Sequence, residues 1–136
     1  KGLAIVLESI LLMKHYKSCL WFFLMTFFLT QSVLAERFNL QLLMIDDTAC
    51  PYCELWEEEV GYKYFKTDEG KLAPLIRHHY GEKIPEKIFL ISEPIVTPTF
   101  ILLKDNKEKY RIEGYPGEEF FWSFLSEYIQ SIKNGK

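Results

Sequence analysis

The chain has 136 residues, of which 16 are Lys or Arg and 19 are Asp or Glu, so its formal net charge is −3. Its length is that of one ordinary domain. The acidic balance argues against nucleic acids and anionic membrane surfaces as partners.

The first third of the chain has the pattern of an export signal. Met13 is followed by a basic stretch and then by an apolar run from Cys19 to Thr30. Val33 and Ala35 fit a small-residue cleavage site, so we predict a secretory signal peptide at residues 13–35. An uncleaved membrane anchor is the alternative, although the apolar run is short for a span, which needs roughly 20 apolar residues.

This interpretation divides the chain and indicates its compartment. Residues 1–12 lie upstream of a start methionine and are expected to be no part of the fold. Residues 36–136 are expected to form one domain, which carries 13 basic and 18 acidic side chains. Export would place that domain in an oxidising space. Cys19 would leave with the signal peptide, and Cys50 and Cys53 would then have only each other to pair with.

Beyond the leader, the hydrophobic pattern alternates between strand and helix periods. A near-continuous apolar run predicts a buried strand from Phe38 to Ile45. A helix is expected from Pro51 to Phe65, with one buried face formed by Cys53, Trp56, Val60 and Tyr64.

The rest of the chain continues this alternation up to a final amphipathic helix. We expect in order a turn at 67–70, a strand at 75–80, a short helix at 84–91, a strand at 95–103, a hairpin turn at 105–107 and a return strand at 109–113. The last helix should start near Glu118 and present an apolar face of Phe121, Phe124, Leu125, Tyr128, Ile129 and Ile132.

The motif Cys50-Pro51-Tyr52-Cys53 lies between the first strand and the first helix. Two cysteines at this spacing can form a small disulfide ring and open it again. Cys50 would lie at the helix start, where unpaired N–H groups and the positive end of the dipole stabilise a thiolate. Pro51 suits the first helical turn, and Cys53 is placed to resolve a mixed disulfide. The motif predicts redox catalysis without a cofactor.

Other uses of a Cys-x-x-Cys pair are weighed against this one. A zinc site usually needs a second ligand pair, a c-type haem site would need histidine at the position of Glu54, and a structural disulfide this small adds little loop entropy. His78 and His79 suggest a metal site, but adjacent strand residues point to opposite faces. A carrier of a soft metal such as Cu(I) and a non-catalytic interaction module stay open as alternatives.

A second informative stretch is 95–103, in which Thr97-Pro98 opens an apolar strand. A proline cannot donate to a strand ladder, so it belongs at the start of a strand. Together with Cys50-Pro51-Tyr52-Cys53 and the order of elements, it gives the chain a pattern that resembles the thioredoxin fold. The narrower match is to the SoxS-type periplasmic thioredoxins of sulfur-oxidising bacteria, through the segments 50–61, 69–75, 97–100 and 111–122.

The resemblance implies a thioredoxin-like three-layer α/β/α fold with a central mixed sheet of about four strands. It implies that the Thr97–Pro98 bond is cis and lies beside the cysteine pair, and that Pro51, Tyr52, Thr97 and Pro98 bind substrate. It also implies a periplasmic monomer that reduces protein disulfides, draws electrons from a membrane-bound thiol reductant and is linked to sulfur-oxidation proteins.

Overall fold

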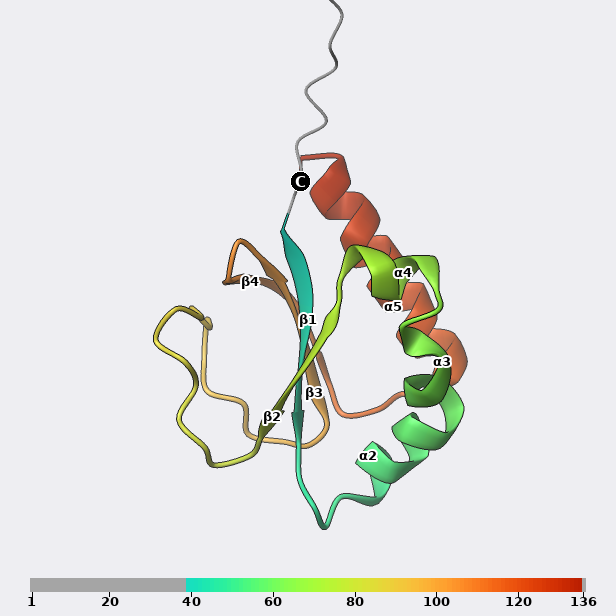
Figure 1. Ribbon diagram of the computed structural model, residues 1–136, viewed down its shortest axis with the longest axis vertical. Coiled ribbons are helices and arrows are strands. Elements are labelled where there is room, and N and C mark those ends of the chain that lie inside the picture. The colour runs from blue at the N-terminus through green and yellow to red at the C-terminus, as the bar shows by residue number, and fades with distance from the viewer. Residues whose placement is uncertain (1–38, 136) are drawn as a thin grey trace, which may run out of the picture. The chain divides into compact units, whose positions relative to one another are not determined.

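The computed structural model describes residues 39–135, which form a four-stranded sheet with helices against it (Figure 1). The strand order is β2-β1-β3-β4. The strands are β1 (Leu40–Asp46), β2 (Leu75–His79), β3 (Thr99–Lys104) and β4 (Lys107–Glu113). The helices are α2 (Pro51–Trp56), the π-helical η1 (Glu57–Gly61), α3 (Tyr62–Tyr64), α4 (Asp68–Leu72) and α5 (Glu118–Lys133).

The sheet is mixed, as predicted. β1 runs parallel to β2 and antiparallel to β3, with Met44 opposite both Arg77 and Phe100. β3 and β4 form a hairpin whose two turn residues, Asp105 and Asn106, have φ values of 51° and 62°. Two-residue hairpin turns of this hand need positive φ at both positions, which Asp and Asn tolerate better than most residues.

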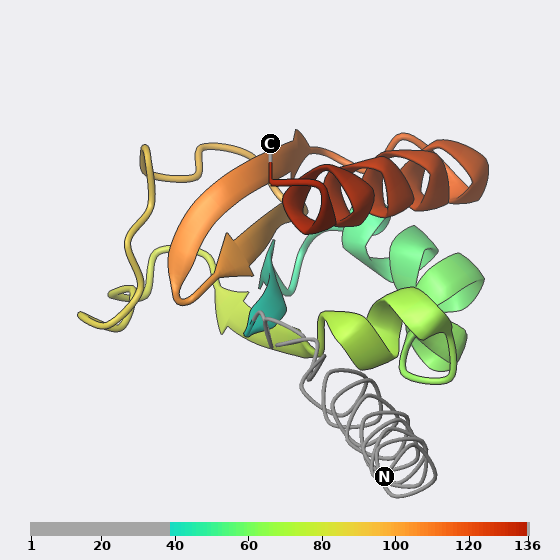
Figure 2. The same ribbon diagram turned by 90° about the horizontal axis from the view of Figure 1, so that it is seen from above.

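The helices cover one face of this sheet, as Figure 2 shows. The predicted apolar faces of the first and last helices meet there, because period-3.6 spacing places these side chains on one stripe. The core on this side includes Leu42, Met44, Cys53, Trp56, Val60, Tyr64, Phe100, Leu102, Phe121, Leu125, Ile129 and Ile132. The mixed four-stranded sheet with flanking helices confirms the predicted thioredoxin-like α/β fold class; within residues 39–135 the layer on the other face is a loop.

The opposite face is covered by the loop that joins β2 to β3. The prediction of a short helix at 84–91 is wrong, because this segment pairs with β4 instead. The Phe89 N–H donates to the Asn106 carbonyl at 2.9 Å, and the Glu108 N–H donates to the Phe89 carbonyl at 2.9 Å. Ile88 packs on the sheet with Leu43, Ile45, Ile101 and Leu103. These long-range contacts outweigh the local helical pattern.

Two further expectations need correction. The turn predicted at 67–70 is the start of α4, because the Thr67 hydroxyl caps this helix by accepting from the Gly70 N–H at 3.0 Å. The apolar face of α5 is narrower than predicted. Phe124 is exposed and Tyr128 half-buried, since both lie at the rim of the stripe, where their rings stack on each other. The expected stop at Asn134 and Gly135 is confirmed.

A buried ion pair on β4 holds the 80–98 loop in place. Arg111 Nε donates to Glu108 Oε1 at 2.8 Å, and Arg111 Nη2 donates to the Ser92 carbonyl at 2.7 Å. Glu108 Oε2 accepts from the Ile91 N–H at 2.8 Å. The side chains of Glu108 and Arg111 are only 3% and 13% exposed.

We therefore expect Glu108→Gln to destabilise the domain by about 1–3 kcal/mol, because it leaves the guanidinium with the half-exposed Glu113, at 3.4 Å, as its carboxylate partner. Urea unfolding followed by circular dichroism measures this change. The matched control is Glu86→Gln, which breaks an exposed ion pair with Lys83 and should change stability by less than about 1 kcal/mol. Equal losses of stability in the two variants would mean that the Glu108–Arg111 pair does not hold the 80–98 loop in place.

The predicted signal peptide at residues 13–35 and the upstream residues 1–12 lie outside the described residues. Within residues 39–135, no helix is both long enough and apolar enough to cross a membrane.

Candidate active site

The predicted cysteine pair forms a disulfide at the start of α2. The Cα atoms of Cys50 and Cys53 are 5.2 Å apart. Cys50 caps the helix, since its Sγ accepts from the Cys53 N–H at 3.1 Å and its carbonyl accepts from the Glu54 N–H at 3.2 Å. The Cys53 N–H at the helix start thus donates to this sulfur, and the positive end of the helix dipole favours negative charge on it.

The two residues between the cysteines face solvent. Pro51 opens the helix and is exposed, and Tyr52 is 61% exposed. The cysteines themselves are buried, with exposed fractions of 5% for Cys50 and 8% for Cys53. A partner would therefore meet the Pro-Tyr pair at the surface and must reach in to the sulfurs.

An aromatic cluster supports the helix under the disulfide. Trp56 is fully buried, with its ring centroid 5.3 Å from that of Phe100 and 5.9 Å from that of Phe121. Its indole N–H has no hydrogen-bond partner among the described residues. Trp56 lies one turn after Cys53 on the same helix face, so it fixes the distance between the helix and the sheet at the site.

Arg77 is a residue of this region that the motif analysis missed. Its guanidinium carbon lies 5.5 Å from the Trp56 ring centroid, and it forms ion pairs with Asp46 at 3.3 Å and with Glu57. A signal was present in the sequence. Arg77 follows Leu75 by two residues on a strand, which places a charge on the face that Leu75 buries.

The Thr97–Pro98 peptide bond is cis, as predicted. Pro98 is buried and Thr97 half-buried. The strand register places Thr99 opposite Ile45, so the start of β3 and the end of β1 lie at the same end of the sheet. The chain runs from that end of β1 to the cysteine motif. Contact between Pro98 and the disulfide stays a prediction.

The loop after β4 adds a tyrosine to the helix layer. The Tyr115 hydroxyl donates to Glu59 Oε2 at 2.6 Å. Burial, followed by this hydrogen bond, raises the pKa of Tyr115 above its ordinary value. Tyr115 therefore stays protonated and continues to donate to Glu59.

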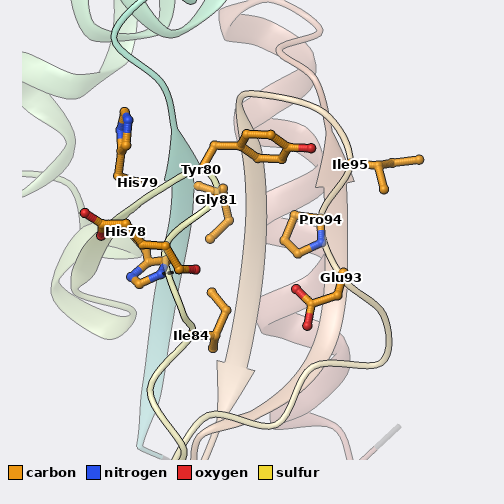
Figure 3. A pocket seen from close by; sticks show the side chains of 10 residues that line it. His78, His79, Tyr80, Gly81, Ile84, Glu93, Pro94 and Ile95 are labelled. Carbon is orange, nitrogen blue, oxygen red and sulfur yellow. Dashed lines mark hydrogen bonds between the residues drawn. The ribbon is translucent and has the colours of Figure 1, made fainter.

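A cleft of about 340 Å³ lies on the opposite face, between the end of β2 and the 80–98 loop (Figure 3). His78 and His79 both border it, but their rings make separate contacts. His78 Nε2 is 3.2 Å from the Glu82 carbonyl, whereas His79 Nδ1 is 3.8 Å from Asp46. The cleft also contains Glu93, at the opposite wall from His78 in Figure 3.

The chain is similar to solved structures of thioredoxins. A crystal structure of the periplasmic thioredoxin SoxS from Paracoccus pantotrophus, in its reduced form, has 40% sequence identity to the chain and a TM-score of 0.67. The match covers 68% of this chain and 98% of that one. A thioredoxin of Malassezia sympodialis, Mala s 13, has 14% identity and a TM-score of 0.46, with 66% and 75% of the two chains covered. No family model and no curated protein matches the chain.

Proposed function

Because the chain belongs to the thioredoxin-like family and lies close to SoxS within it, we propose that it is an exported thiol–disulfide oxidoreductase that reduces protein disulfides in the periplasm. The observation that carries this proposal is the Cys50–Cys53 disulfide at a helix start, where Cys50 Sγ accepts a backbone hydrogen bond. The helix start stabilises a thiolate, which is the form of cysteine that attacks disulfides.

The reaction proceeds in two exchange steps. The Cys50 thiolate attacks one sulfur of the substrate disulfide, forms a mixed disulfide and releases the other sulfur as a thiolate. Cys53 then loses its proton and attacks Cys50 Sγ, which closes the Cys50–Cys53 ring and releases the second substrate sulfur. Two electrons pass from the protein dithiol to the substrate, and the released thiolates take up protons.

The exposed residues around the ring serve binding. Pro51 and Tyr52 present the surface that the substrate meets, and Thr97 and Pro98 supply a backbone edge for an extended substrate segment. A periplasm keeps disulfides oxidised, so the protein is re-reduced by a membrane-bound thiol reductant. It acts as a monomer, and its substrates include proteins of sulfur oxidation, as the likeness to SoxS suggests.

Trapping tests the proposal. In Cys53→Ala the second exchange step is blocked, so the substrate should stay linked to Cys50 as a mixed disulfide. Non-reducing electrophoresis of the protein from a bacterial periplasm should show adducts that reductant dissolves, and mass spectrometry identifies them. The control is the double variant Cys50→Ala with Cys53→Ala, which should trap nothing. If Cys53→Ala forms no adduct at Cys50, the proposed function is wrong.

A further inference from the structure

Arg77 joins the two chain segments on either side of Cys50. It lies on β2, an edge strand of the sheet, and its guanidinium is 3.3 Å from Asp46 Oδ2 at the end of β1. It also pairs with Glu57, which follows Cys53 by four residues on the first helix. The segment from Asp46 to Glu57 contains the whole cysteine motif, so one side chain fixes both of its ends.

Asp46, Arg77 and Glu57 thus form a clamp around the cysteine motif. On its helix side, Gly61 leaves room for the Glu57 carboxylate. A Cβ added to Gly61 would lie 2.5 Å from Glu57 Oε2, so the carboxylate occupies space that any larger residue at position 61 would take. Residues 57–61 are π-helical, a rare geometry that occurs often at functional sites. Glycine is less favourable than alanine inside a helix.

The contact between Arg77 and Trp56 connects the clamp to the core around the dithiol. The Arg77 guanidinium carbon lies 5.5 Å from the ring centroid of Trp56, in the range of cation–π contacts. Trp56 is fully buried and belongs to the same core cluster as Cys50 and Cys53. Arg77 therefore lies against a ring of the core cluster that includes both cysteines.

We propose that Arg77 is a positioning residue of the dithiol, which acts with Glu57 to hold Cys50 and Cys53 within bonding distance of each other. This inference rests on the proposed function. The redox step is the reaction of the protein dithiol with glutathione disulfide, which gives the protein disulfide and two molecules of glutathione. Two electrons and two protons pass to glutathione disulfide. Ring closure depends on the effective concentration of one sulfur near the other, which falls when either segment loosens.

The test measures this equilibrium by alkylation and mass spectrometry in a series of glutathione buffers. Every protein is the full chain with Cys19→Ser, so that only Cys50 and Cys53 exchange. Arg77→Gln and Glu57→Gln are each expected to shift the equilibrium toward the dithiol by about threefold to fivefold. These variants change the local charge in opposite directions, so a common direction of shift identifies positioning. Shifts in opposite directions would mean that charge acts instead, and would overturn the proposal.

Two further variants complete the design. Lys63→Gln makes the same charge change as Arg77→Gln and removes another ion pair of the first helix, with Glu118. It should leave the equilibrium within about twofold of the parent. Gly61→Ala keeps every charge and favours the helix, but displaces the Glu57 carboxylate, so it should shift the equilibrium toward the dithiol even if Arg77→Gln fails to fold.

The outcomes separate this inference from the proposed function. If the parent protein does not exchange with glutathione at all, the proposed oxidoreductase function fails. If the parent exchanges but Arg77→Gln, Glu57→Gln and Gly61→Ala equilibrate as it does, the function stands and the role of Arg77 is wrong.

Discussion

Replacing Cys50 by serine is expected to reduce the rate of disulfide reduction to that of the uncatalysed reaction. A serine hydroxyl stays protonated at neutral pH and does not attack a disulfide, whereas a cysteine at a helix start attacks as the thiolate. Insulin reduction in the presence of dithiothreitol, followed by turbidity, measures the rate. The control is Cys19→Ser, which removes the third cysteine of the chain and should leave the rate unchanged.

The same assignment predicts the order of alkylation in the reduced protein. Cys50 should react with iodoacetamide at lower pH than Cys53, because its sulfur accepts the Cys53 N–H at the helix start. Peptide mapping after brief alkylation across a pH series gives the order. Modification of Cys53 first, or full activity of Cys50→Ser, would mean that the nucleophile is misassigned.

Replacing Trp56 by alanine is expected to destabilise the domain by about 3–5 kcal/mol, because it empties the space under the first helix. Trp56 is fully buried, and its ring contacts Phe100, Phe121 and Tyr64. Guanidinium unfolding of the oxidised protein, followed by far-ultraviolet circular dichroism, measures the loss without relying on tryptophan emission.

The control for this prediction is Trp56→Phe. Phenylalanine keeps much of the ring contact, and the lost indole N–H makes no hydrogen bond within the described residues. We expect a loss clearly smaller than that of the alanine variant, about 1–2 kcal/mol. A small loss in Trp56→Ala as well would mean that the cluster collapses readily and that Trp56 does not set the helix position.

The sequence by itself determined the elements whose signals are local. The helix stripe of Cys53, Trp56, Val60 and Tyr64 is buried as predicted, because periodicity follows directly from helix geometry. The cysteine motif and the hairpin turn were also predicted, since each depends on a few adjacent residues with special chemistry. The cis bond before Pro98 was predicted through the family resemblance that these local patterns reveal. These features were sufficient to indicate the fold and the candidate redox pair.

The tertiary structure decided whatever depends on residues far apart in the chain. Residues 84–91 contain a helical pattern, but Phe89 pairs with β4 and Ile88 packs on the sheet. Backbone groups of this loop form hydrogen bonds with the β3–β4 hairpin, and these long-range bonds override the helical preference of the segment. Arg77 had no motif to identify it, because its partners Asp46 and Glu57 are 31 and 20 residues away. Only the folding of β2 against β1 and the first helix brings these three charges together, beside the helix that carries the cysteines.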